Sequence, residues 1–230
     1  MNLSVRDADV LELMDDPDCD ARRLEATLRR FDTVNRLWSG WGGLYRARLA
    51  PHLASLQRPA RVLDLGSGGG DLIARLSRLA EHDGLDVRWV GVDPDPRAHA
   101  VAVRRASSRI EFRSTDAAAL VTAGETFDAV LSNHVLHHLS TEELRRFADE
   151  SLALADGIVL HSDIRRGHLP YWLYAVGVTP FAPGTFLRTD GLRSIRRSYR
   201  AGELAAALEQ PWQVEEASPF RVVAVGRSGG

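Results

Sequence analysis

The sequence contains no lysine, so all 29 of its basic residues are arginines. This one-sided usage points to a codon bias, and a cluster of arginines is therefore weak evidence for a binding surface. The 31 acidic residues leave a formal net charge of −2. Proteins that bind the phosphates of nucleic acids usually carry a basic excess. The charge balance therefore argues against a nucleic-acid partner.

Cysteine and long apolar runs are also scarce. The single cysteine, Cys19, excludes a disulfide framework and a clustered thiolate metal site. The longest apolar run, Tyr171 to Val178, is far shorter than the roughly 20 residues that a membrane span needs. The first ten residues are polar and acidic, unlike a secretory signal peptide. We therefore expect a cytoplasmic protein with no membrane span.

Much of the sequence alternates short apolar runs with segments of helical spacing. Such alternation favours a parallel, doubly wound α/β sheet with helices on both faces. Two further strands near the C-terminus, joined by Ser218-Pro219, predict an antiparallel hairpin that closes the sheet. Helical spacing ahead of the first strand predicts two N-terminal helices. The predicted strands cover residues 61–65, 87–92, 110–113, 127–132, 157–162, 212–216 and 220–225, and the N-terminal helices cover 21–38 and 44–56.

The most informative stretch is Arg61 to Leu72, which reads RVLDLGSGGGDL. An apolar run with one acid, Asp64, leads into four glycines and then into a helical pattern. A strand, a glycine turn and a helix N-terminus form a cradle for a nucleotide, because glycine lets a ligand approach the backbone closely. The dinucleotide pattern G-x-G-x-x-G would place its third glycine at Asp71, whereas the spacing here is D-x-G-x-G-x-G.

This pattern resembles motif I of the class I S-adenosylmethionine-dependent methyltransferases, in the branch that acts on small natural products and quinones. The resemblance implies a Rossmann-like, doubly wound sheet of seven strands, mostly parallel with an antiparallel C-terminal strand. It also implies S-adenosylmethionine as the cofactor and S-adenosylhomocysteine as the product. The cofactor carries a sulfonium and an ammonium group, so Asp64 can orient the glycine loop and add negative potential near the methionine end.

Acidic residues follow the second and third predicted strands, at the sheet edge where an open α/β sheet binds its ligands. Asp93 can accept hydrogen bonds from both ribose hydroxyls, and Asp116 can accept one from an adenine amino group. Either acid can instead cap the helix that follows it. The resemblance covers roughly residues 60 to 163 and assigns the cofactor to matching positions. These are Asp64, Gly66, Ser67, Gly68, Gly70, Asp93, Pro94, Asp116, Ala117, Asn133 and His134.

After the fourth predicted strand the sequence reads NHVLHHL, from Asn133 to Leu139. This segment resembles one found in small-molecule methyltransferases, some of which combine paired histidines here with an acid just after the fifth strand. The matching catalytic residues are His137, His138 and Asp163. A histidine that titrates near neutrality can take the proton that an attacking hydroxyl group must lose. We predict His137 as this base; alternatively, one histidine, His138 first, only hydrogen-bonds the backbone.

The three histidines of this segment also raise the question of a metal. His134 and His138 have the i, i+4 spacing of two ligands on one helix. A zinc site needs a third ligand and often an H-E-x-x-H arrangement, which the sequence lacks. We therefore predict no metal. His161, inside the fifth predicted strand, is expected to face a helix rather than the ligand.

The resemblance also suggests a division of the chain into parts. These are an N-terminal helical cap (1–58), a cofactor-binding core (59–163), a substrate-covering insertion (164–200), and a final helix with a hairpin that completes the sheet (201–230). The predicted substrate contacts are an aromatic wall of Tyr171, Trp172 and Tyr174, an anion-binding Arg188 (or Arg193), and Trp41. Alternatively, these side chains pack an ordinary amphipathic helix and a solvated arginine face.

The sequence thus predicts a small-molecule methyltransferase. The main hypothesis is O-methylation of a phenolic or polyketide-type hydroxyl in secondary metabolism. Methylation of a quinone-type ring carbon is an alternative, as is a partner or regulator that binds S-adenosylmethionine without catalysis. An NAD(P)-dependent oxidoreductase is disfavoured by Asp71 and because a Tyr-x-x-x-Lys pair is absent. Nucleic-acid amino methyltransferases are disfavoured because the segment from Ser132 to Val135 does not match [DN]-P-P-[YFW].

Overall fold

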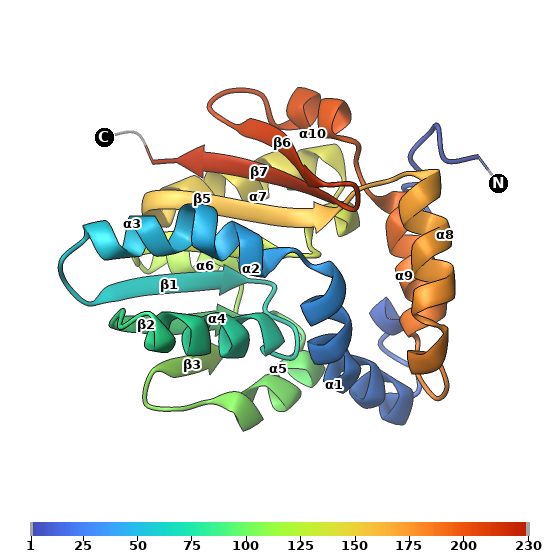
Figure 1. Cartoon of the computed structure of the whole chain (residues 1–230), viewed down its shortest axis with the longest axis horizontal. Helices are drawn as coiled ribbons and strands as arrows, with labels where there is room; N and C mark the ends of the chain where they lie inside the picture. Colours follow the sequence, from blue (N-terminus) through green and yellow to red (C-terminus); the bar gives the residue numbers. More distant parts are fainter. Residues whose placement is uncertain (1, 229–230) are drawn as a thin grey trace.

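The fold is a single sheet of seven strands with helices on both faces (Figure 1). The computed structural model describes residues 2–228, except for the side chains of Asp32 and residues 34–38. The strand order is β3-β2-β1-β4-β5-β7-β6, and only β7 runs antiparallel to its neighbours β5 and β6. This confirms the predicted architecture. The strands are β1 (Ala60–Leu65), β2 (Val87–Val92), β3 (Ile110–Arg113), β4 (Phe127–Asn133), β5 (Ala155–Ile164), β6 (Gln213–Ser218) and β7 (Arg221–Arg227).

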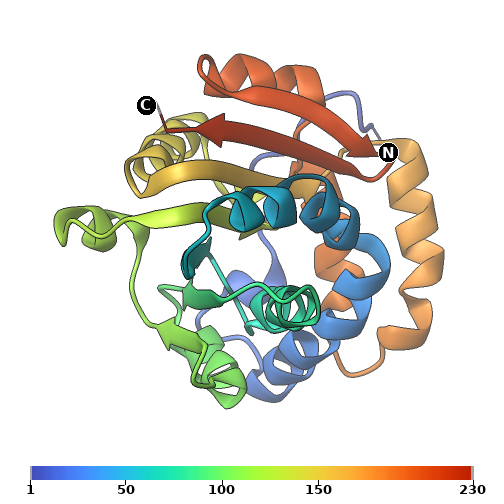
Figure 2. The same cartoon turned by 60° about the vertical axis from the view of Figure 1, so that its left-hand side comes forward.

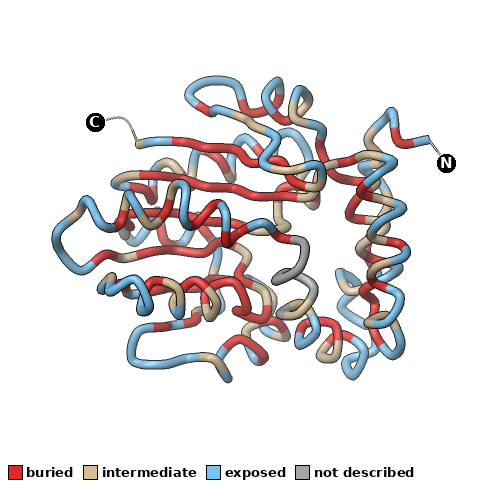
Figure 3. Tube along the Cα trace, in the orientation of Figure 1, coloured by how far each residue is buried: buried red, intermediate tan, exposed pale blue. Residues whose placement is uncertain are grey.

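Both faces of the sheet are covered, and the buried residues run along the strands (Figure 3). One core joins Val62, Trp89 and Leu131 to helices α2, η2, α3 and α4. The other joins Leu63 and Val130 to α6, α7 and α10. Burial on two sides explains why the strands read as nearly continuous apolar runs. These helices are α2 (Trp41–Leu44), η2 (Tyr45–Leu49), α3 (Ala50–Ser55), α4 (Asp71–His82), α6 (Ala117–Thr122), α7 (Thr141–Ala153) and α10 (Ala201–Leu208).

Three further helices lie across the carboxyl ends of the parallel strands (Figure 1). They are α1 (Ala21–Trp38), α8 (His168–Gly177) and α9 (Leu187–Arg197), and the short turn η1 (Leu13–Asp15) lies against α9. Figure 2 shows β6 and β7 with α10 at one edge of the sheet. The remaining elements are α5 (Pro96–Ala102), η3 (Val103–Arg105), η4 (Leu136–His138) and η5 (Thr179–Phe181). The carboxyl edge of the sheet is therefore covered by segments from both halves of the chain.

Two stretches differ from the sequence prediction in detail. Residues 44–56 were expected as one helix, but the helical path has a π-helical stretch, η2, between α2 and α3. Residues 164–200 were expected to break the strand–helix rhythm, and they contain α8 and α9 separated by the Pro180–Gly184 stretch. No helix in the described part of the chain is long and apolar enough to cross a membrane. The four-part division of the chain stays a prediction.

His161 is buried inside β5 on the face that α7 covers, as the sequence predicted. Its ring packs between Phe147 and Trp212, with centroid separations of 5.0 and 5.1 Å. Its Nδ1 lies 2.8 Å from the Ser132 hydroxyl, and its Nε2 has no hydrogen-bond partner among the described residues. Burial lowers the pKa of His161 to about 3. The folded protein therefore holds this ring neutral.

We predict that His161 makes the protein sensitive to acid. An unfolded histidine titrates near pH 6.5, so its neutral form contributes full stability above about that pH. The contribution is lost as the pH falls towards 3, with a slope of up to about 1.4 kcal/mol per pH unit. The variant His161→Leu should flatten the fall in unfolding free energy between about pH 6 and 4, as measured by urea unfolding. The exposed-site variant His168→Leu is the control, and an unchanged slope in His161→Leu would contradict the prediction.

Candidate functional site

A cavity of about 480 Å³ lies at the carboxyl ends of β1, β2 and β4. Its walls come from the glycine loop after β1, the turn after β2, the histidine segment after β4, and parts of η1, α1, α8 and α9. The volume falls in the range of about 300–1,000 Å³ that small-molecule sites occupy. The position is the one expected for ligand binding in a doubly wound sheet.

The glycine loop between β1 and α4 has the conformation that its composition predicts. Gly66, Gly68 and Gly70 have φ angles of +69°, +52° and +77°, a region that favours glycine. The amides of Gly66 and Ser67 both donate to the carbonyl of Val92, at 2.9 Å. The loop is therefore tied to the end of β2, and Gly66, Ser67 and Gly68 line the cavity.

Two carboxyl groups lie under this loop. Asp64 is buried, and its Oδ1 has no hydrogen-bond partner among the described residues. Burial, with Asp71 and Asp93 nearby, raises the pKa of Asp64 well above its ordinary value. Asp93 accepts from the amides of Gly68 and Asp95, each at 2.9 Å, while burial raises its pKa. An orphaned carboxylate oxygen at a ligand cavity fits a cationic ligand group, since a cation would satisfy it.

Three predicted cofactor positions lie away from the cavity wall. Asp116 caps α6, accepting from the amide of Ala119 at 2.9 Å, and Ala117, the first residue of that helix, is buried. Gly70 packs on the sheet instead, since a Cβ there would meet the ring of Phe112 at 2.5 Å. The structure therefore gives Asp116 the capping role that the sequence left open. Its contact with an adenine group stays a prediction.

The segment after β4 is fixed by a buried arginine from β7. Arg221 donates to Oδ1 of Asn133 at 2.6 Å and to Nε2 of His134 at 2.9 Å. Burial, and then the charge of Arg221, lowers the pKa of His134 well below its ordinary value, so this ring stays neutral. Nε1 of Trp41 also donates to Asn133, at 3.0 Å. Trp41 is thus buried behind the cavity wall, and it does not line the cavity.

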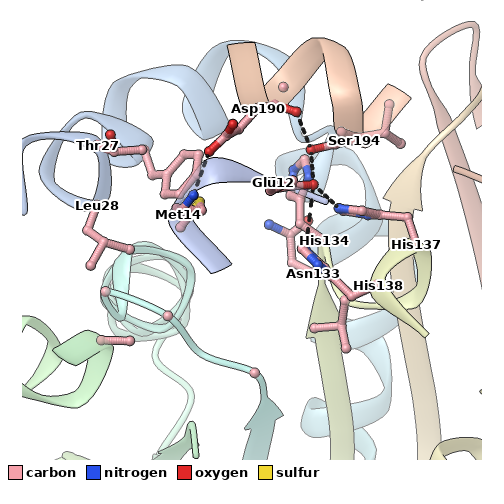
Figure 4. Close-up of a pocket in the computed structure, with 18 of the residues that line it drawn as sticks. Glu12, Met14, Thr27, Leu28, Asn133, His134, His137, His138, Asp190 and Ser194 are labelled. Atoms are coloured by element: carbon pink, nitrogen blue, oxygen red, sulfur yellow. Dashed lines mark hydrogen bonds and ion pairs between the residues drawn. The ribbon is translucent and has the colours of Figure 1, made fainter. Parts of the chain in front are cut away.

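His137 and Asp163 form a buried pair beside the cavity. Asp163 holds the ring through Nδ1 at 2.8 Å and accepts from the His137 amide at 2.8 Å. The opposite nitrogen, Nε2, lies 3.2 Å from Oε1 of Glu12 (Figure 4). Burial opposes the charged form of His137, but the two carboxylates outweigh it and raise its pKa to about 9. The structure thus brings two of the predicted catalytic residues together with one acid that sequence reasoning missed.

The N-terminal segment carries Glu12 into this position, and α9 holds it there. The Ser194 hydroxyl donates to Oε1 of Glu12 at 2.6 Å, and Asp190 accepts from the amides of Leu13 and Met14 (Figure 4). His138 joins the same group, with Nδ1 3.3 Å from Oδ2 of Asp15 and Nε2 3.9 Å from Oε1 of Glu12. These contacts join residues 12–15 to the histidine turn.

The charges that line the cavity are mostly negative. Two arginines line it, and both have partners: Arg97 pairs with Asp95, and Arg221 binds Asn133 and His134. The acids are more numerous, which gives the cavity a negative potential suited to cations. The acids that line it are Glu12, Asp15, Asp64, Asp71, Asp93, Asp95 and Asp190.

Most of the predicted substrate contacts do not line the cavity. Tyr174 lines it, packing on Gly191 and donating to the carbonyl of Leu187 at 2.8 Å. Pro170, one helical turn earlier, also lines it, and this pair defines the inner face of α8. Trp172 lies on another face and is 62% exposed. The structure does not bring Tyr171 or the exposed Arg188 to the cavity either.

Comparison with known proteins finds similarity to methyltransferases. A family model described as a methyltransferase domain matches residues 62–155. A ubiquinone biosynthesis O-methyltransferase of Dinoroseobacter shibae is 34% identical over 154 residues, covering 65% of this chain and 58% of the relative. A protein of the same description from Brucella ovis is 34% identical over 118 residues, covering 51% of this chain and 46% of the relative. The chain thus spans about half the length of these curated relatives.

Solved structures support the same fold. A plantazolicin methyltransferase, in complex with a monoazolic desmethylPZN analogue and S-adenosylhomocysteine, superposes with a TM-score of 0.58 at 13% identity, covering 94% of this chain and 92% of the other. The magnesium protoporphyrin IX methyltransferase of Synechocystis PCC 6803, with bound S-adenosylmethionine, gives 0.52 at 16% identity, covering 83% and 80%. At these identities the likeness concerns the fold alone, and it confirms the Rossmann-like architecture.

We predict that the glycine loop tolerates a side chain at Gly68 far better than at Gly66. Both residues have positive φ, so alanine costs about 1–2 kcal/mol of backbone strain at either position. At Gly66 the new Cβ would also meet Cγ2 of Val135 at 2.6 Å, whereas at Gly68 no atom lies within 4 Å. Gly66→Ala should therefore lower the unfolding free energy by about 1–3 kcal/mol more than Gly68→Ala, as measured by urea denaturation.

The double variant Gly66→Ala/Val135→Ala separates the clash from the strain. It should recover part of the difference, because the atom that the new Cβ meets is then gone. Equal destabilisation by the two single variants would show that the contact with Val135 yields without cost.

Proposed function

The chain belongs to the class I S-adenosylmethionine-dependent methyltransferase family, and we propose that it transfers a methyl group to a hydroxyl group of a small aromatic molecule. The observation that carries this proposal is the shared cavity. Its wall contains both the glycine loop after β1 and the buried His137, whose ring Asp163 holds. A cofactor on that loop and an acceptor beside that ring would meet inside one enclosed space.

The electrostatics of the cavity favour S-adenosylmethionine over a dinucleotide. When bound, this cofactor supplies an activated methyl group on a positively charged sulfonium. The excess of acids over arginines in the cavity wall attracts such a cation and repels a pyrophosphate. The orphaned oxygen of Asp64 is placed for the cationic methionine end, and Asp93 beside Gly68 for the ribose. Gly66, Ser67 and Gly68, which line the cavity, supply close backbone contact.

His137 is the residue that we assign to removal of the acceptor's proton. Asp163 fixes the ring by accepting from Nδ1–H, so Nε2 is the proton-accepting atom of the neutral ring. Glu12 contacts that atom at 3.2 Å, so an acceptor hydroxyl competes with Glu12 for the same position. Loss of the Glu12 contact favours the neutral form, because Glu12 is one of the groups that raise the pKa of His137. The acceptor oxygen would attack the methyl group that bound S-adenosylmethionine would supply, with loss of the carbon–sulfur bond, and the hydroxyl proton would pass to Nε2 of His137. Alignment of the reacting atoms can supply much of the rate.

The acceptor is proposed from the curated relatives and from the walls of the cavity. The relatives are named for O-methylation in ubiquinone biosynthesis, which favours a phenolic hydroxyl over a ring carbon. Phe31, Leu187 and Ile195 offer apolar surface to an aromatic ring. Of the predicted aromatic wall, Tyr174 is the member that we retain in this role. The free thiol of Cys19 suits a reducing compartment, and we propose the cytoplasm.

Cofactor binding gives a direct test of the proposed site. S-adenosylmethionine and S-adenosylhomocysteine should bind in calorimetric titrations, whereas NADH and NADPH should not. Asp93→Ala should weaken S-adenosylmethionine by about 1–3 kcal/mol through lost charge-assisted hydrogen bonds. Asp149→Ala, on the exposed face of α7, is the control. Unchanged affinity in Asp93→Ala would reject the ribose role, and binding of a nicotinamide cofactor would reject the proposed function.

Turnover tests the catalytic assignment. With a panel of phenols, catechols and hydroquinones, formation of S-adenosylhomocysteine should identify an acceptor. His137→Asn should then lower kcat by about 10²–10⁴-fold and leave cofactor affinity nearly unchanged. His168→Asn, at an exposed histidine on α8, should behave like the parent protein. Full activity in His137→Asn would move the base elsewhere, and cofactor binding without any product would favour a non-catalytic role.

A further inference from the structure

Three potential metal ligands converge at the edge of the cavity. One nitrogen or oxygen atom from each of Glu12, His137 and His138 lies within 4.8 Å of the others (Figure 4). Oε1 of Glu12 is the common point, 3.2 Å from Nε2 of His137 and 3.9 Å from Nε2 of His138. Bonds of about 2.0–2.2 Å to one cation would place tetrahedral ligand atoms about 3.3–3.6 Å apart. Small inward shifts of the side chains would therefore complete a site.

The groups behind these ligands have the arrangement found around protein metal sites. A histidine that binds a metal usually donates its other ring N–H to a carboxylate or carbonyl, which fixes its orientation. Both histidines meet this condition here. Nδ1 of His137 lies 2.8 Å from Asp163, and Nδ1 of His138 lies 3.3 Å from Asp15. Both Nε2 atoms therefore face Glu12, whose Oε1 the Ser194 hydroxyl also holds.

The local charge favours a cation as well. Glu12, Asp15 and Asp163 surround the two imidazoles, and Asp190 lines the same cavity. Arg197 is the arginine that enters this group, with its guanidinium 3.5 Å from Asp15. Arg6 approaches from the other side but donates to the carbonyls of residues 137, 139 and 197. A divalent cation would offset the carboxylate charge that remains.

We propose that Glu12, His137 and His138 form a binding site for one divalent transition-metal cation, with Asp163 and Asp15 orienting the two histidines. Two imidazoles and one carboxylate suit zinc, manganese or cobalt, whereas magnesium and calcium prefer oxygen ligands throughout. The open side of the site faces the cavity. The sequence alone predicted no metal because a third ligand was missing, and Glu12 supplies it from 125 residues upstream.

Cation binding has a consequence that rests on the proposed function. A cation on Nε2 of His137 occupies the lone pair that the proposed base uses, so loading the site should inhibit methyl transfer. It would also bind the N-terminal segment to the turn after β4, because Glu12 and the histidines come from these two segments. The site itself can be tested without cofactor or acceptor, so its failure is distinguishable from failure of the methyltransferase proposal.

The test is a titration of the chelator-treated full chain with Co²⁺, Mn²⁺ and Zn²⁺, read by Co²⁺ absorbance, Mn²⁺ paramagnetic resonance and metal content after gel filtration. We expect one equivalent per chain. Glu12→Gln and His138→Asn should each weaken binding at least tenfold, and Asp15→Asn by about tenfold or more through the lost support of His138. His168→Asn removes an exposed histidine and should bind like the parent chain. Thermal melts without metal establish that each variant is folded.

Two results would overturn the proposal. One is binding well below one equivalent for all three cations. The other is binding that neither Glu12→Gln nor His138→Asn weakens, which would place the cation at surface histidines. The variant His138→Asn keeps the test sharp even where Glu12→Gln loosens the N-terminal segment, because His138 is partly exposed. In a separate assay, activation by the cation would leave the site standing and reject His137 as the base.

Discussion

The site depends on how the buried carboxylate of Asp163 is satisfied. This group lies at the end of β5, between β4 and β7, and it accepts from the backbone and the ring of His137. Burial disfavours its charge, but His137 and then the more distant Arg221 outweigh that penalty and lower its pKa. Removing one member of a buried charged pair typically costs about 3–5 kcal/mol. The histidine turn, and with it one wall of the cavity, is therefore fixed by the sheet.

A second constraint follows, because the protonated ring of His137 needs a partner on its other side. Glu12 provides it, and the cost of burying Glu12 is offset by His137, then by His138 and last by Ser194. The chain from Leu3 to Asp15 is consequently tied down along α9, with Arg166 and Arg200 donating to backbone carbonyls at its start. One buried imidazole thereby connects the core sheet, the N-terminal segment and the helices that roof the cavity.

Some of these contacts could be predicted from the sequence, and others could not. The glycine loop, Asp93 and the pairing of His137 with Asp163 were predictable, because each sits at a strand end and strand ends meet at one edge of a parallel sheet. Glu12 and Arg221 were not, since their roles depend on where segments 125 and 87 residues from their partners return in space. Trp172 is a further example. The sequence shows an aromatic cluster, but the packing of α8 on α9 determines which face of α8 turns towards the cavity.

Glu12 covers the nitrogen of His137 that we propose as the base, and this contact constrains which acceptor can react. Nε2 of His137 would take the proton, and Glu12 contacts this same atom. An acceptor hydroxyl can therefore reach the base only by displacing Glu12. A hydroxyl that enters must replace the hydrogen bond to Glu12 and leave this carboxylate with Ser194 and His138. A water molecule could also replace Glu12 at Nε2, but it has no apolar surface whose burial would offset the lost hydrogen bond. The aromatic body of the acceptor, packed on Phe31, Leu187 and Ile195, would thus help to determine which hydroxyl group is deprotonated.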